Sequence, residues 1–311
     1  MNPSPDSLSK PPARVWLATL AFLAALALFP LAASASGEAL RVFVSIAPQE
    51  YFVKRVGGDR VAVTVMVPPG ASPATYEPRP RQMAGLSTAR LYLAVGVPFE
   101  TAWLPRFASA NPAMRVVRTE EGIEKVPMAR HHHEEEADHE GEGSGGHGVL
   151  DPHVWTSPPL VKILAKNIAS ALALADPAGR EAYGAGYRDF ARDLDELDAE
   201  FKAIFSGAAH REFMVFHPAW GYFAQAYGLV QVPVEIEGKE PKPGQLADMI
   251  DEARHRGIRV IFVQPQNSRR AAQTVAKAVG ARLVTADPLA ADWMENIRKQ
   301  ATAFARALEK E

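Results

Sequence analysis

The alternation of short β-rich runs with helical stretches is the feature that most limits what this chain can fold into. Four such runs occur in the first half of the chain and four in the second half. Short apolar runs separated by helices are typical of parallel sheets that carry helices on their faces. We therefore predict an α/β protein with two lobes, whose strands cover residues 41–46, 61–67, 91–95, 115–117, 213–216, 230–234, 259–263 and 282–285.

One long amphipathic segment lies between the two groups of strands. From Ala182 onward, apolar residues recur at alternating spacings of four and three, and the segment has no glycine or proline after Gly186. This spacing predicts a single helix of about 24 residues, which would span roughly 36 Å. We expect a rigid helix over 181–206 that joins an N-terminal lobe (36–180) to a C-terminal lobe (207–311); an ordinary long helix within one domain is the alternative. The apolar stripe consists of Tyr183, Tyr187, Phe190, Leu194, Leu197, Phe201 and Ile204.

The N-terminus has the pattern of a secretory signal peptide. Lys10 and Arg14 precede an apolar run over residues 15–31, and small residues follow up to Ala35. The run is too short and too poorly flanked for a transmembrane anchor. We expect cleavage after Ala35, which removes residues 1–35 and leaves a mature protein in a bacterial periplasm that does not span the membrane.

Composition excludes several classes of partner. The formal net charge is −2, so the chain lacks the basic surface that nucleic acid or anionic lipid requires. It has no cysteine, so neither disulfides nor a lipidated cysteine can hold the exported protein. We expect a soluble protein that binds no nucleic acid.

A histidine-rich and acidic segment occupies residues 129–148. Five of the nine histidines of the chain lie in it, mixed with glutamates and glycines. Imidazole and carboxylate groups bind borderline divalent metals, and this composition is too polar to form a core. We predict a disordered loop that binds metal weakly; a solvated acidic linker is the alternative. Its histidines are His131, His132, His133, His139 and His147.

Three further residues are candidate metal ligands because of their positions in loops and at the ends of predicted strands. His153 lies in a loop stiffened by prolines, where Asp151 can accept the second ring N–H. His217 and Asp287 each follow a predicted strand, and ligands bind at the carboxyl ends of parallel strands. Packed or helix-capping roles are the alternatives for all three residues. If the lobes face each other, these side chains make a set that suits zinc better than manganese.

The chain resembles the solute-binding receptors of zinc and manganese ABC importers over nearly its whole mature length. The motifs that carry the resemblance occur in the family's order and spacing: Ile46-Ala47-Pro48, Val56-Gly57-Gly58-Asp59, Val67-Pro68-Pro69-Gly70-Ala71, Thr75-Tyr76-Glu77-Pro78, Asp151-Pro152-His153-Val154-Trp155, Phe216-His217-Pro218-Ala219-Trp220-Gly221-Tyr222-Phe223, Glu240-Pro241-Lys242-Pro243 and Asp287-Pro288-Leu289. The resemblance implies two βαβ lobes joined by one long rigid helix, with a metal ion held between them, and we expect this ion to be Zn²⁺. It also implies delivery to a membrane permease that works with a cytoplasmic ATPase, and we expect the receptor itself to be a monomer.

The resemblance implies four metal ligands, of which His153, His217 and Asp287 are three. The family's remaining histidine is replaced by Ala74, which cannot coordinate a metal. A water, the carboxylate of Glu77 or Glu50, or a histidine of the 129–148 segment could take that place. Histidine at position 217 and the histidine-rich segment favour zinc over manganese.

Three other functions remain open at this point. A receptor for manganese or another divalent metal is one. An exported zinc-dependent hydrolase is another, because a missing ligand leaves a position for an activated water, although no compact catalytic metal motif is present. An adhesin or metallochaperone that uses the same fold is the third.

Overall fold

The structure, a computed structural model, describes residues 38–129, 149–208, 210–235, 242–267 and 269–309. The signal peptide predicted for residues 1–35 lies outside this range. So do the histidines of the 129–148 segment, namely His131, His132, His133, His139 and His147. The chain from Ala39 onward forms one compact unit.

A parallel sheet of four strands forms the N-terminal lobe. Its order is β2-β1-β3-β4, and its helices are α2 (Ala47–Gly57), α3 (Pro80–Leu86) and α4 (Pro98–Ala110). Each strand falls where the alternation of apolar runs predicts one. The strands are β1 (Leu40–Val44), β2 (Val61–Val65), β3 (Leu91–Ala94) and β4 (Arg115–Arg118).

The C-terminal lobe repeats this arrangement. Its four parallel strands have the order β6-β5-β7-β8, which is the order of the first lobe although no sequence repeat is evident. The strands are β5 (Glu212–Val215), β6 (Val230–Pro233), β7 (Val260–Val263) and β8 (Arg282–Thr285). The helices are α7 (Gly221–Ala226), α8 (Pro243–His255), α9 (Arg270–Val279) and α10 (Trp293–Leu308). The predicted α/β fold with two parallel sheets is confirmed.

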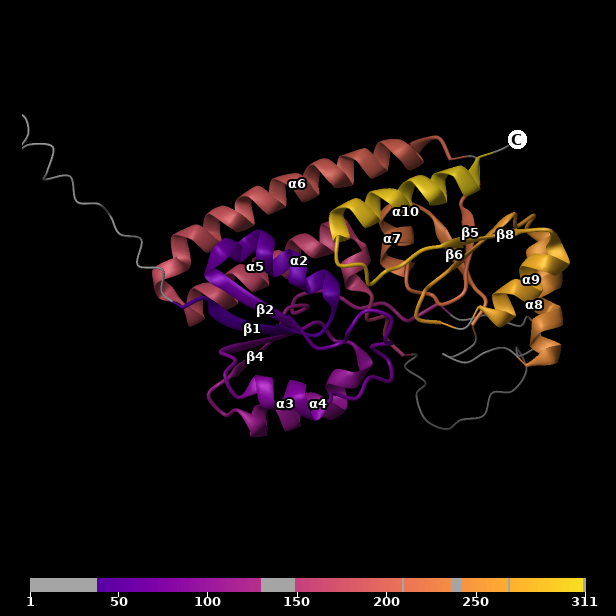
Figure 1. Ribbon diagram of the computed structural model, residues 1–311. Helices are drawn as coiled ribbons and strands as arrows, with labels where there is room; N and C mark the ends of the chain where they lie inside the picture. Colours follow the sequence, from indigo (N-terminus) through magenta and orange to yellow (C-terminus); the bar gives the residue numbers. More distant parts are fainter. Residues whose placement is uncertain (1–37, 130–148, 209, 236–241, 268, 310–311) are drawn as a thin grey trace, which may run out of the picture. The chain divides into compact units, whose positions relative to one another are not determined.

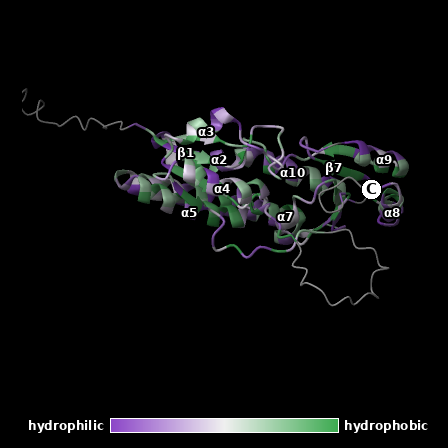
Figure 2. Ribbon diagram, turned by 90° about the horizontal axis from the view of Figure 1, so that it is seen from below, coloured by the Kyte–Doolittle hydropathy of each residue, from purple (hydrophilic) through white to green (hydrophobic). Residues whose placement is uncertain are grey.

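The central strands are apolar because both faces of each sheet are covered. All four residues of β3 and all four of β7 are buried. Strands covered by helices on both faces read as continuous apolar runs, which is why these segments could be recognised from sequence. Figure 2 shows the hydrophobic residues of β7 and α5 (Pro158–Ala175) in green.

Helix α6 (Arg180–Ser206) is the predicted long helix and has 27 residues. It lies along α5 and contacts α2, both of which belong to the N-terminal lobe (Figure 1). It also contacts α10, and α10 in turn contacts β5 of the C-terminal lobe. The predicted apolar stripe is correct except at its end. Ile204 is 37% exposed, whereas Phe205 is 1% exposed, because a step of four residues from Phe201 follows the 3.6-residue helical period on this face.

Helix α5 is long and apolar enough, by length and composition, to cross a membrane. Its buried residues, which include Val161, Leu164, Ile168 and Leu172, belong to the same hydrophobic core as the N-terminal sheet. We therefore interpret α5 as a core helix of the lobe.

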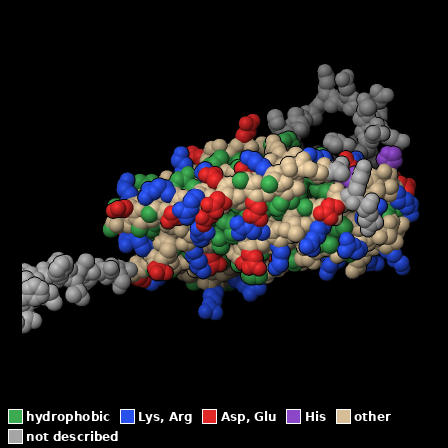
Figure 3. Space-filling model, turned by 90° about the horizontal axis from the view of Figure 1, so that it is seen from above, with side chains coloured by type: hydrophobic (Ala, Val, Ile, Leu, Met, Phe, Trp, Pro, Cys, Tyr) green, Lys and Arg blue, Asp and Glu red, His purple; other side chains and the backbone are tan. Residues whose placement is uncertain are grey.

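The face that carries α6 and α10 bears charged side chains of both signs. Figure 3 shows Lys and Arg interspersed with Asp and Glu across it. Several of these charges pair, for example Arg55 with Asp193 and Arg298 with Glu200 at 2.9 Å. A mixed surface of this kind agrees with the nearly neutral net charge.

Candidate metal site between the lobes

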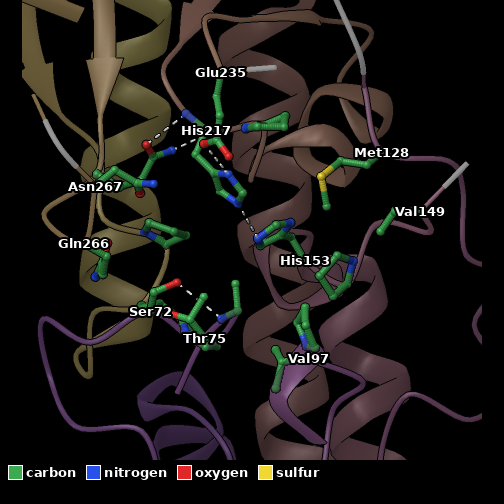
Figure 4. A pocket seen from close by; sticks show the side chains of 18 of the residues that line it. Ser72, Thr75, Val97, Met128, Val149, His153, His217, Glu235, Gln266 and Asn267 are labelled. Atoms are coloured by element: carbon green, nitrogen blue, oxygen red, sulfur yellow. Dashed lines mark hydrogen bonds and ion pairs between the residues drawn. The ribbon is translucent and has the colours of Figure 1, made fainter. Parts of the chain in front are cut away.

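A cavity of about 500 Å³ lies where the carboxyl ends of the two sheets meet. Figure 4 shows His153 and His217 on one side of it and Ser72, Thr75 and Val97 on the facing side. Most of its wall is apolar. The N-terminal lobe contributes Ser72, Pro73, Ala74, Thr75, Val97, Pro98, Met128, Ala129, Val149, Pro152, His153 and Trp155, and the C-terminal lobe contributes His217, Pro218, Glu235, Gln264, Gln266, Asn267, Pro288 and Leu289.

Asp151 orients the imidazole of His153 in the segment that precedes α5. One carboxylate oxygen of Asp151, Oδ1, accepts the backbone N–H of His153 at 2.9 Å and lies 2.7 Å from its Nδ1. Asp151 is 1% exposed and His153 is 8% exposed. Burial lowers the pKa of His153 below its usual value, against the opposing effect of Asp151. The imidazole is therefore held in its neutral form, which is the form that binds metal.

His217 lies two residues beyond β5, as the sequence predicts. The side-chain amide of Gln264 fixes its backbone: Oε1 accepts the His217 N–H at 3.2 Å, and Nε2 donates to the His217 carbonyl at 2.8 Å. The ring nitrogen Nδ1 lies 2.9 Å from Oε2 of Glu235, a carboxylate that is 6% exposed. This histidine is thus oriented in the same way as His153.

The two imidazoles face each other through their Nε2 atoms, which are 3.3 Å apart. Because a carboxylate occupies the Nδ1 side of each ring, the proton belongs on Nδ1 and the lone pair on Nε2. Two nitrogens bound to one tetrahedral zinc at about 2.0–2.1 Å would be separated by about 3.3–3.4 Å. The pair therefore has the spacing and the tautomers that a shared zinc ion requires.

Asp287, the third predicted ligand, does not join this pair. Its Oδ1 accepts hydrogen bonds from Gln266 Nε2 at 2.8 Å and from the backbone N–H of Leu289 at 2.9 Å. It does not line the cavity, although Pro288 and Leu289 do. Within the described residues, no three His, Cys, Asp or Glu side chains gather into a group that could hold an ion.

The two carboxylates suggested as replacements for the missing histidine also lie away from the cavity wall. Glu50 pairs with Lys54 on α2 at 2.6 Å, and Glu77 is exposed. Ala74 does line the cavity, where the resemblance places the absent ligand. The third suggestion, a histidine from the 129–148 segment, falls outside the described residues.

Glu235 is a residue of the candidate site that sequence reasoning missed. It follows β6, the strand hydrogen-bonded to β5, and its backbone N–H donates to the carbonyl of Phe216 at 2.9 Å. An acidic residue at the end of a neighbouring parallel strand is the signal that could have identified it. Gln264, Gln266 and Asn267, which follow β7, could have been found in the same way.

Comparison of the sequence and structure with known proteins identifies the family of this chain. A high-affinity zinc uptake system protein, ZnuA of Bacillus subtilis (strain 168), is 31% identical over 257 residues, which cover 80% of this chain and 78% of that protein. PsaA of Streptococcus anginosus, a manganese ABC transporter substrate-binding lipoprotein, is 27% identical over 270 residues (82% and 83%).

A solved structure described as the crystal structure of ZnuA is similar to this chain with a TM-score of 0.80 at 39% sequence identity. The similarity covers 88% of this chain and 100% of the solved one. Residues 42–307 match the family described as zinc-uptake complex component A, periplasmic. The chain belongs to this family, ZnuA, of zinc-binding receptors for ABC importers.

Proposed function

We propose that this protein captures Zn²⁺ between its lobes through Nε2 of His153 and Nε2 of His217, and releases it to the permease of an ABC importer. The observation that carries the ligand assignment is the 3.3 Å separation of the two Nε2 atoms, each opposed by a carboxylate on its Nδ1 side. Asp287 is the predicted oxygen ligand, and its Oδ2 is the atom that would bind zinc, since Oδ1 accepts two hydrogen bonds.

The donor set supports zinc over manganese. Two imidazoles suit zinc, whereas manganese prefers a shell with more oxygen atoms. Electrostatics also favour a cation, because a divalent ion held by the two imidazoles compensates charge on the carboxylates of Asp151 and Glu235 that lie behind them. Nearly complete burial of both carboxylates makes this compensation important.

Substrate-binding proteins of ABC importers act together with a membrane permease and an ATPase, and members of this family are receptors rather than enzymes. The exported hydrolase is therefore excluded. We further propose that the receptor is an exported monomer, released by cleavage after Ala35. The intact mass of the secreted protein tests the cleavage site, and light scattering tests the monomer.

Zinc titration against a chromogenic chelator tests the ligand assignment. The mature protein should hold one zinc tightly, and His153→Ala and His217→Ala should each abolish the tight site. His255→Ala is the matched control, because His255 is exposed at the end of α8. Equal zinc affinity of the wild type and these three variants would refute the site. Deleting residues 129–148 should remove only weak zinc binding, and loss of the tight site would show that the segment supplies a ligand.

A further inference from the structure

Among the described residues, the side of the cavity at Ala74 offers no imidazole, thiolate or carboxylate to a metal held by the two histidines. Ala74 ends in a methyl group, and its neighbours Pro73, Val97 and Pro98 are apolar. Even with Asp287 brought in, a tetrahedral zinc shell formed with His153 and His217 would lack one ligand.

The side chains that could fill this position from the described part of the chain are placed elsewhere. Glu50 is paired with Lys54, and Glu77 is exposed and does not line the cavity. Ser72 and Thr75 carry hydroxyls on that side, but a neutral hydroxyl is not a usual zinc ligand, and Ser72 Oγ accepts the backbone N–H of Ala74 at 3.3 Å. The missing donor must therefore come from outside this part of the protein.

The size and chemistry of the cavity indicate what kind of donor fits. A water molecule occupies about 30 Å³, far less than the 500 Å³ available. The apolar part of the wall offers water no hydrogen bonds, whereas burying carbon atoms against it is favourable. Cavities of this size with apolar walls and a few polar groups are typical sites for small organic molecules.

We propose that the cleft binds zinc together with one small nitrogen–oxygen chelator, such as an amino acid, whose donor atoms occupy the side left open at Ala74. This inference rests on the proposed zinc site. The imidazoles bind one side of the ion and the chelator binds the other side, with its carbon skeleton against Val97 and Pro98. The hydroxyl of Thr75 and the amide of Asn267, which both line the cavity, can donate hydrogen bonds to the chelator's carboxylate.

Native mass spectrometry of the mature protein with zinc alone, and with zinc plus L-histidine, tests this proposal. The expected species is a ternary complex with one zinc and one L-histidine. At buffered free Zn²⁺, added L-histidine should lower the free zinc concentration at half-saturation about tenfold. Changes in the groups that surround metal ligands alter metal affinity by a factor of this size.

The variant Ala74→His should bind zinc without L-histidine and should lose the ternary species, because an imidazole then occupies the open side. Ala84→His, on the exposed surface of α3, is the matched control and should behave as the wild type. A variant lacking residues 130–148, which keeps Ala129 of the cavity wall, should retain the ternary complex.

Three results would overturn the proposal. In the first, L-histidine only competes for zinc and no ternary species forms. In the second, Ala74→His binds zinc with L-histidine as the wild type does. In the third, deletion of residues 130–148 abolishes the bound zinc, which assigns the missing ligand to that segment. Failure of the proposed function itself looks different, because neither the wild type nor Ala74→His would then bind zinc under any condition.

Discussion

The indole N–H of Trp293 donates a hydrogen bond to the backbone carbonyl of Trp155 at 2.8 Å. Trp155 donates in turn, through its own indole N–H, to the carbonyl of Pro288 at 2.8 Å. Trp155 stands two residues after His153, and Pro288 directly follows Asp287. The two indoles therefore connect the loop of one predicted ligand in the N-terminal lobe to the loop of another in the C-terminal lobe.

Replacing Trp293 with Phe should destabilise the protein. The indole is 2% exposed, so its loss leaves the carbonyl of Trp155 without its donor in the core, which costs about 1–3 kcal/mol. Urea unfolding measures the difference. Trp103→Phe is the control, because Trp103 is partly exposed on α4, and it should change the unfolding free energy by less. Equal effects of the two substitutions would mean that the hydrogen bond contributes nothing.

The fold was largely predictable from sequence, and the site only in part. Strands such as β3 and β7 are continuous apolar runs between helical segments, and such runs can be read directly from the residue types in the sequence. Positions at strand ends, such as His217, follow from the topology of parallel sheets. Glu235 directly follows a predicted strand, which marks it as a candidate, but its pairing with His217 depends on β6 lying beside β5, and local spacing does not encode strand order. The position of the Asp287 side chain likewise depends on its hydrogen bond with Gln266. This is a contact between two loops, and the periodicity of the sequence does not specify it.

The carboxylates behind the histidines should matter nearly as much as the histidines. Asp151→Asn and Glu235→Gln each replace an acceptor that sets the tautomer of an imidazole, so zinc affinity should fall by about 10–100-fold. Competition titration against a chelator measures this loss. Glu50→Gln and Glu77→Gln are matched controls, since neither side chain lines the cavity. A larger loss in the controls than in Asp151→Asn and Glu235→Gln would reassign the site to Glu50 or Glu77.

Gly221, the first residue of α7, leaves room for Asp151. A Cβ atom at this position would lie 2.7 Å from Oδ2 of Asp151 and 3.0 Å from Nε2 of Gln231. We expect Gly221→Ala to displace the Asp151 carboxylate and weaken zinc binding, even though the residue touches no metal. Gly244→Ala is the control, because a Cβ there meets no atom within 4 Å. It should leave zinc binding unchanged, and titration of both variants alongside the wild type makes the comparison.

A buried carboxyl group in the N-terminal lobe should make stability depend on pH. Glu100 is 2% exposed, and its carboxylate accepts hydrogen bonds from Ser45 Oγ and from the backbone N–H groups of Val95 and Gly96. Burial raises the pKa of Glu100 from 4.5 to about 7, despite these donors. The turn that it anchors leads directly to Val97 and Pro98 of the cavity.

Because the pKa of Glu100 is raised in the folded state, unfolding releases a proton between pH 4.5 and 7. Stability from this group is fully present below pH 4.5 and is lost as pH rises through 7, a change of about 3 kcal/mol. Urea unfolding at pH 4.5, 6 and 8 should therefore show a decline in the wild type that Glu100→Gln lacks. Glu121→Gln, at an exposed position, should keep the decline. An identical pH profile in wild type and Glu100→Gln would show that the buried carboxyl group ionises normally.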